Sequence, residues 1–167
     1  MFDDKKITMA ELCDALEHNF EGYDDIRQML LNAPKFGNDD DYADEQVAWV
    51  LHEWMSEFNK VTNLRGGHGC PGGSVMGAYV PEGNVTGALP SGRLAWEPLC
   101  DASSPSRGMD VNGPTAVMKS MGKIDNIEIL GGITFNLRID PAVFKDGDVE
   151  RMAALVRTFV DQKIFHM

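Results

Sequence analysis

The chain has 167 residues, 43% of them hydrophobic, and a formal net charge of −11. This length has room for one domain with a core of its own. The negative charge argues against nucleic acid or an anionic membrane surface as a partner. No apolar run of about 18 residues marks a membrane span and no secretory signal opens the chain. Three widely spaced cysteines fit a reducing compartment, so we expect a cytoplasmic protein.

Residues 1–62 are expected to be helical. Thr8 and Glu11 form a capping box, and apolar residues at helical spacing continue until Gly22, where the first helix should end. A second helix is expected over Asp24–Asn32. The acidic run Asn38–Asp41 then precedes a longer helix, whose dipole it complements. The apolar stripe of that helix comprises Val47, Val50, Leu51, Trp54 and Phe58.

The rest of the chain changes character twice. Residues 63–113 predict glycine- and proline-rich loops with one short strand, Ser74–Val80. Residues 114–167 predict a helix from Pro114 to about Gly122, a half-buried strand over Ile133–Ile139 and a final helix over Asp148–Gln162. This mixture of helices and strands indicates an α/β protein.

The glycine loop around His68 and Cys70 offers two chemical interpretations. A structural zinc site needs four ligands, and a second pair is missing; a nucleophilic Cys70 needs a base and an oxyanion hole. Gly67, Gly69 and Gly72 match a dinucleotide-binding spacing, but a strand is expected after them where that site needs a helix. A flexible glycine loop is therefore favoured, and we predict no catalytic residue and no metal site.

The loops between Thr86 and Val117 carry four charged residues of interest: Arg93, Glu97, Asp101 and Asp110. These could bind a substrate, but charges spread through long ordered loops more often bond to backbone groups that no regular structure satisfies. We therefore expect them to hold the loops. The candidate substrate contacts are Ser74 and Tyr79, with simple packing as the alternative for Tyr79.

Three long segments resemble the glycyl radical enzymes, the family of pyruvate formate-lyase, glycerol and diol dehydratases, choline lyase and arylacetate decarboxylases. They are ALEHNFEGYDDIRQMLLNAPKFGNDDDY from Ala15, TGALPSGRLAWEPLCDASSPSRGMDVNGPTAVMKS from Thr86 and ITFNLRIDPAVF from Ile133. The resemblance covers almost the whole chain. NAPKFGNDDDY and NGPTAV are closer to the dehydratase, lyase and decarboxylase branch than to pyruvate formate-lyase.

The resemblance implies a slice of a ten-stranded α/β barrel with a helical N-terminal third. In the family, a backbone glycyl radical passes its spin to a cysteine thiol, and the thiyl radical abstracts hydrogen from a small-molecule substrate. A radical S-adenosylmethionine activating enzyme installs the radical. The barrel excludes water and oxygen from this chemistry.

Both reactive motifs of the family are absent from this sequence. Cys70 is followed by Pro71 and Gly72 and lies in another segment than the family's thiyl cysteine, and Cys13 and Cys100 match no better. No glycine lies in an Arg-Val-Ala-Gly-Tyr-type sequence, so the glycyl radical is expected only in a full-length enzyme, and no cofactor is expected to bind here.

We therefore expect a fragment of a glycyl radical lyase or dehydratase that is inactive alone. Strands cut from a barrel leave unpaired edges, so the isolated chain should be marginally stable and self-associate. The alternative is a non-catalytic subunit that complements or binds a radical enzyme.

Overall fold

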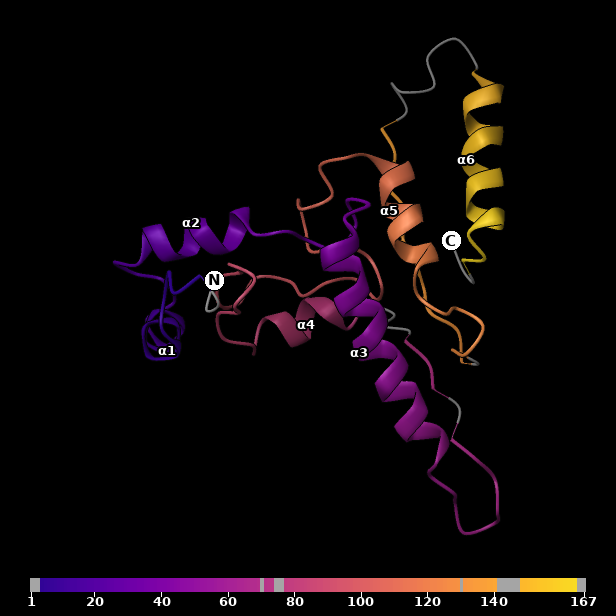
Figure 1. Cartoon of the computed structure of the whole chain (residues 1–167), viewed down its shortest axis with the longest axis horizontal. Coiled ribbons are helices and arrows are strands. Elements are labelled where there is room, and N and C mark those ends of the chain that lie inside the picture. The colour runs from indigo at the N-terminus through magenta and orange to yellow at the C-terminus, as the bar shows by residue number, and fades with distance from the viewer. Residues whose placement is uncertain (1–3, 70, 74–76, 130, 141–147, 165–167) are drawn as a thin grey trace. The chain divides into compact units, whose positions relative to one another are not determined.

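The computed structural model describes residues 4–69, 71–73, 77–129, 131–140 and 148–164. The chain forms two compact units, each built from two stretches of sequence (Figure 1). Unit 1 comprises Met1–Ala33 and Gly77–Leu99, and unit 2 comprises Pro34–Met76 and Cys100–Met167. No helix in the described part of the chain combines the length and the apolarity needed to cross a bilayer.

Unit 1 contains helices α1 (Met9–Glu17), α2 (Asp24–Asn32) and α4 (Tyr79–Gly83). The predicted capping box is confirmed: the Thr8 hydroxyl accepts from the Glu11 amide while the Glu11 carboxylate accepts from the Thr8 amide. The predicted bounds of α2 are also confirmed. The core of unit 1 comprises Ile7, Leu12, Ala15, Phe20 and Leu30.

The first helix ends earlier than its apolar spacing predicts. Glu17 is its last residue, because Asn19 and Phe20 adopt left-handed backbone angles, with φ of 51° and 62°. The Phe20 amide donates to the Ala15 carbonyl at 2.7 Å, which closes the helix end, and the Phe20 ring still joins the core. Gly22 as the end of this helix was therefore a wrong prediction.

Unit 2 contains α3 (Asp41–Asn59), α5 (Pro114–Gly122) and α6 (Val149–Asp161). Helices α5 and α6 match their predicted bounds to within a residue, and α3 is the longer helix expected after the acidic run. Pro114 opens α5 because the first turn of a helix does not need its missing amide. Asp148 caps α6 by accepting from the Arg151 amide. The core comprises Met55, Val117, Met118, Met121, Ile124, Ile129, Ile133, Phe135, Leu155 and Ile164.

The apolar stripe predicted for α3 is only partly buried. Val47 and Leu51 pack against the core beside the buried Met55, which the prediction did not include, but Val50 and Trp54 are 55% and 44% exposed. Phe58 is also exposed, at 38%. The stripe is therefore wider than the surface that covers it.

Neither predicted strand forms among the described residues, where β-structure is limited to isolated bridges. In the first, Ser74–Val80, residues 74–76 lie outside the described residues, and Tyr79 and Val80 belong to α4 instead. In the second, Ile133–Ile139, the backbone forms a parallel bridge from Ile133 to Gly73. The predicted α/β class is thus not evident in the described residues, whose regular structure is helical.

Candidate functional site

A carboxylate is buried where α3 packs on α5. Asp44 lies in the first turn of α3 and is fully buried. Its Oδ2 atom accepts hydrogen bonds from Ser120 Oγ and Lys123 Nζ, each at 2.8 Å, and its Oδ1 atom accepts from the Gly37 amide at 3.4 Å. A buried charge is tolerated only with such partners.

Lys123 forms ion pairs with three aspartates of this cluster. Its ammonium lies 2.7 Å from Asp41, 2.8 Å from Asp44 and 3.3 Å from Asp39, at the C-terminal end of α5. Burial favours the neutral amine, but the three carboxylates outweigh it and raise the pKa of Lys123. We name Asp39, Asp41, Asp44, Ser120 and Lys123 the Asp44 network.

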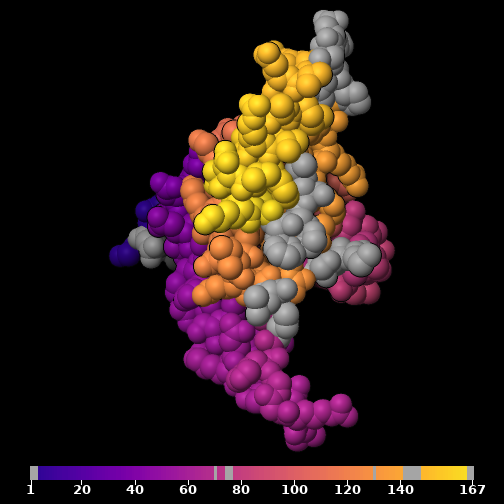
Figure 2. Space-filling view, turned by 90° about the vertical axis from the view of Figure 1, so that its right-hand side faces the viewer, coloured from indigo at the N-terminus to yellow at the C-terminus, as the bar shows by residue number. Residues whose placement is uncertain are grey.

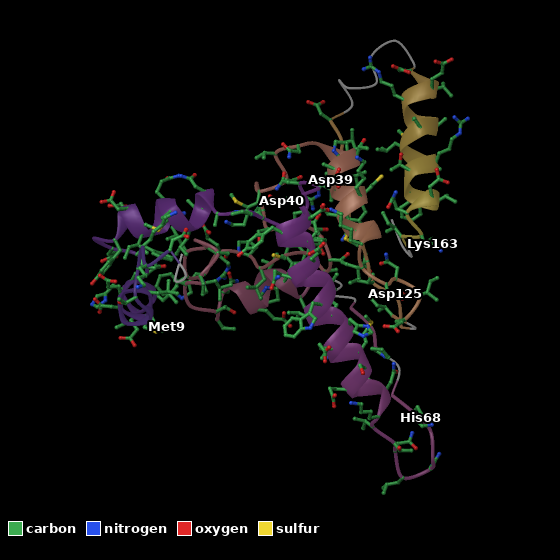
Figure 3. All side chains as sticks on the ribbon, viewed as in Figure 1. Met9, Asp39, Asp40, His68, Asp125 and Lys163 are labelled. Carbon is green, nitrogen blue, oxygen red and sulfur yellow. The ribbon has the colours of Figure 1, made fainter. Side chains whose placement is uncertain are left out.

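Asp39 links the network to its exposed edge. Its amide donates to Ser120 Oγ at 2.9 Å, and its carboxylate accepts from Lys119 at 2.9 Å. The hydrogen bond from Lys119 lowers the pKa of Asp39, with Lys123 acting in the same direction. Asp39 and Asp40 lie at the N-terminal end of α3 beside α5 (Figure 3).

Asn38 fastens the loop that leads into α5. Its amide group donates to the carbonyls of Lys35, at 3.2 Å, and Met109, at 2.7 Å. Its Oδ1 atom accepts from the amides of Val111 and Asn112 at 2.9 and 3.1 Å. Both donors and both lone pairs of the side chain are therefore used. The segments NAPKFGNDDDY and RGMDVNGPTAVMKS, far apart in sequence, are joined here.

These contacts hold helices and loops in place and do not form a reactive site. Every charged group of the Asp44 network has a partner, so the network offers neither a free base nor an activated nucleophile. Among the described residues no group of three or more His, Cys, Asp or Glu side chains is arranged to hold a metal ion. The arrangement fixes α5 and the loop before it against the start of α3.

Two of the four predicted loop residues lie in unit 1. Arg93 donates to the carbonyl oxygens of Gly83 (2.9 Å), Gly87 (2.8 Å) and Pro98 (3.4 Å), and also to that of Glu97. The Glu97 carboxylate accepts from the Leu94 amide at 3.2 Å. The guanidinium thus binds three loop carbonyls and the carbonyl at the end of α4, which no helix or sheet satisfies.

The other two lie in unit 2. Asp101 accepts from the side-chain amide of Asn136 at 2.7 Å, beside Ser103, whose hydroxyl donates to the Thr134 carbonyl at 2.7 Å. The loop thereby bonds along the extended segment that follows Ile133. Asp110 is exposed.

Two further candidate residues, Tyr79 and His68, are not part of the Asp44 network. Tyr79 opens α4, is half-buried, and its carbonyl accepts from the Leu99 amide at 3.0 Å. Ser74 and Cys70 lie outside the described residues. His68 is exposed in the turn beyond α3 (Figure 3).

Sequence reasoning missed Asn38, Asp44 and Lys123. Asp44 carried a signal, since it shares a helical face with Val47, Leu51 and Met55 at spacings of three and four residues. A charge within an apolar stripe indicates a buried partner. Lys123 and Asn38 carry no comparable local signal.

Comparison with known proteins covers nearly all of the chain. The family described as "Pyruvate formate lyase-like" matches residues 1–83, and "Glycine radical" matches residues 99–167. The isethionate sulfite-lyase of Bilophila wadsworthia is 41% identical over the whole chain, and the trans-4-hydroxy-L-proline dehydratase of Clostridioides difficile is 38% identical. The chain spans 20% and 21% of their respective lengths.

A solved structure shares the fold. The B12-independent glycerol dehydratase of Clostridium butyricum matches 98% of this chain with a TM-score of 0.91 and 41% identity, over 21% of its own length. The two segments joined by Asn38 are among those that carry the family resemblance. The chain belongs to the glycyl radical enzyme family and corresponds to about a fifth of the length of its relatives.

Proposed function

We propose that this chain is the positioning segment of a glycyl radical lyase or dehydratase, and part of that family's α/β barrel. The observation that carries the proposal is the junction made by Asn38 and the Asp44 network, which joins two family segments without exposing a reactive group. The relatives of this chain are a sulfite-lyase, dehydratases and a decarboxylase, which supports the proposal that the full-length enzyme acts on a small-molecule substrate.

The reactive groups are proposed to lie outside this segment. The sequence holds no Arg-Val-Ala-Gly-Tyr-type motif and no cysteine in the family's thiyl context. The chain alone is therefore catalytically silent, and a radical S-adenosylmethionine activating enzyme acts only on the full-length protein. Ser74 and Tyr79 remain our proposed substrate contacts, supported for Tyr79 by its half-buried place at the start of α4.

The proposal is tested by a graft. In the Clostridium butyricum glycerol dehydratase, the segment that this chain matches is replaced by residues 1–167, and the protein is treated anaerobically with the activating enzyme of the recipient. Because the recipient supplies the reactive residues, we expect an organic radical signal by electron paramagnetic resonance and measurable glycerol turnover. The isolated chain, treated in the same way, is expected to give neither.

Two results would contradict the proposal. A graft that folds and assembles like the recipient but acquires no radical shows that the segment cannot serve in a radical enzyme. Turnover or a radical in the isolated chain shows that it is not a positioning segment only.

A further inference from the structure

Helix α3 carries an apolar ridge that its own unit leaves uncovered. Val50, Trp54 and Phe58 recur every fourth residue, and Val61 follows just beyond the helix. They are 55%, 44%, 38% and 58% exposed, respectively. The rings of Trp54 and Phe58 lie 5.7 Å apart between centroids, so these two side chains form one continuous apolar surface. We name these four residues the α3 ridge.

The hairpin after α3 extends this surface in an ordered way. The Asn63 side-chain oxygen accepts from the amides of Arg65 and Gly67 at 2.9 and 3.0 Å, and Thr62 bridges to His68. These bonds fix the turn and leave Leu64 fully exposed at its tip. In Figure 2 the end of α3 and this hairpin, violet to magenta, project beyond the other elements of the unit.

Trp49, a second exposed tryptophan on the same helix, is an isolated apolar side chain and not part of a ridge. Trp49 is 61% exposed, more than Trp54. Its neighbours one turn away are all polar: Glu45, Gln46, His52 and Glu53. Single exposed apolar side chains are common on monomers, whereas contiguous ones mark interaction surfaces. Trp49 belongs to the first class and Trp54 to the second.

We propose that the α3 ridge and Leu64 form the surface on which the remaining polypeptide of the glycyl radical enzyme packs. This inference rests on the proposed function. The relatives of this chain contain the same fold within chains about five times as long. In the match to the glycerol dehydratase, 98% of this chain aligns with 21% of the dehydratase. Most of the polypeptide that can cover the ridge therefore lies outside this segment.

Charge favours this occupant over a second copy of the chain. Glu53 flanks the ridge along α3, Glu57 is paired with Lys60 at the end of the helix, and the chain as a whole carries a net charge of −11. Two copies packed ridge to ridge would bring like charges together at the rim of the contact, which is unfavourable. The partner surface that fits is apolar at its centre and neutral or basic around it.

The test measures the water accessibility of two tryptophans by hydroxyl-radical footprinting with mass spectrometry. The isolated chain at low concentration is compared with the glycerol dehydratase graft described above. We expect the oxidation rate of Trp54 to fall by about tenfold in the graft, since a side chain at the centre of a packed interface is excluded from water. Trp49, the matched control, should keep its rate.

Each other outcome counts against the proposal. Trp54 that is oxidised as fast in a folded graft as in the isolated chain has no covering surface in the enzyme. Trp54 that becomes as strongly protected in the isolated chain at raised concentration as in the graft identifies a second copy as the occupant. A graft with protected Trp54 but no radical contradicts the proposed function and leaves this surface intact, so the two failures are distinguishable.

Discussion

The carboxylate of Asp44 loses its hydration when α3 and α5 pack, and three donors replace the lost water. Only one of them, Lys123, carries a charge. Removing one partner of a buried ion pair leaves the other charge uncompensated, which costs more than the pair contributes on balance. The stability of this junction should therefore depend strongly on Lys123 and weakly on the exposed lysine beside it.

Lys123→Met tests this dependence, with Lys119→Met as the matched control. We expect Lys123→Met to lower the free energy of unfolding by about 2–3 kcal/mol, somewhat less than a fully buried pair because the lysine side chain keeps some exposure. Lys119 pairs with Asp39 at the surface, so its loss should cost less than about 1 kcal/mol. Urea unfolding followed by circular dichroism compares the two; equal losses would show that Asp44 does not need the ammonium.

Residues that act locally could be predicted from the sequence, and those that act across the chain could not. The Thr8–Glu11 capping box joins residues three apart, so the pattern alone reveals it. Asn38 and Val111 are 73 residues apart, and nothing in either segment specifies the other. Asn38–Asp41 were expected only to complement the dipole of the helix that follows them. Their hydrogen bonds to Met109 and Lys119 could not be predicted, because these partners also lie more than 70 residues away in the sequence.

At the scale of elements, helices were predictable and strands were not. A helix satisfies its own backbone, whereas a strand needs a neighbour. The segment from Ile133 keeps the predicted alternation, with Ile133 and Phe135 buried and Asn136 and Arg138 exposed. Its ladder is replaced by isolated bridging, with Ile133 paired to Gly73, and by bonds from the loop at Ser103. Periodicity thus predicted which side chains are buried but not the hydrogen bonds.

Helix α4 shows how closely a short element can approach a loop. Gly83 ends this helix and is buried, and a Cβ atom built on it would lie 2.8 Å from the Pro98 Cα atom. Backbone cannot yield to such a contact as a flexible side chain can. We expect Gly83→Ala to destabilise the chain by about 1–3 kcal/mol through overpacking.

Gly87→Ala is the control for this substitution. A Cβ atom at Gly87 would meet nothing within 4 Å. Its effect should be small and of either sign, since alanine also restricts the unfolded chain. Urea midpoints by circular dichroism decide the matter: if Gly83→Ala shifts the midpoint no more than Gly87→Ala does, the close approach of α4 to the loop is not a determinant of stability.

At the scale of the whole molecule, two helices carry apolar stripes wider than the surface available to cover them. In α6, Leu155 is buried while Val149, Met152, Val156 and Val160 are exposed, by 74%, 43%, 42% and 64%. The α3 ridge is the second case. All three tryptophans of the chain are exposed, although this residue type is usually highly buried. Composition predicted enough apolar residues for a core but could not indicate how many of them this segment alone would cover.

Uncovered apolar surface has a consequence for the isolated chain, which we expect to associate as its concentration rises. The contacts should be weak and non-specific, because net negative charge opposes any close approach. Trp54→Glu combined with Val156→Glu places a charge in each exposed stripe and should shift the molecules toward monomer without loss of helicity. Sedimentation velocity over a concentration series measures the association. Trp49→Glu adds a charge outside both stripes and should shift it much less. A chain that stays monomeric throughout the series and unfolds cooperatively on heating would contradict this prediction. It would show that the exposed apolar surfaces do not drive association and that the segment is stable on its own.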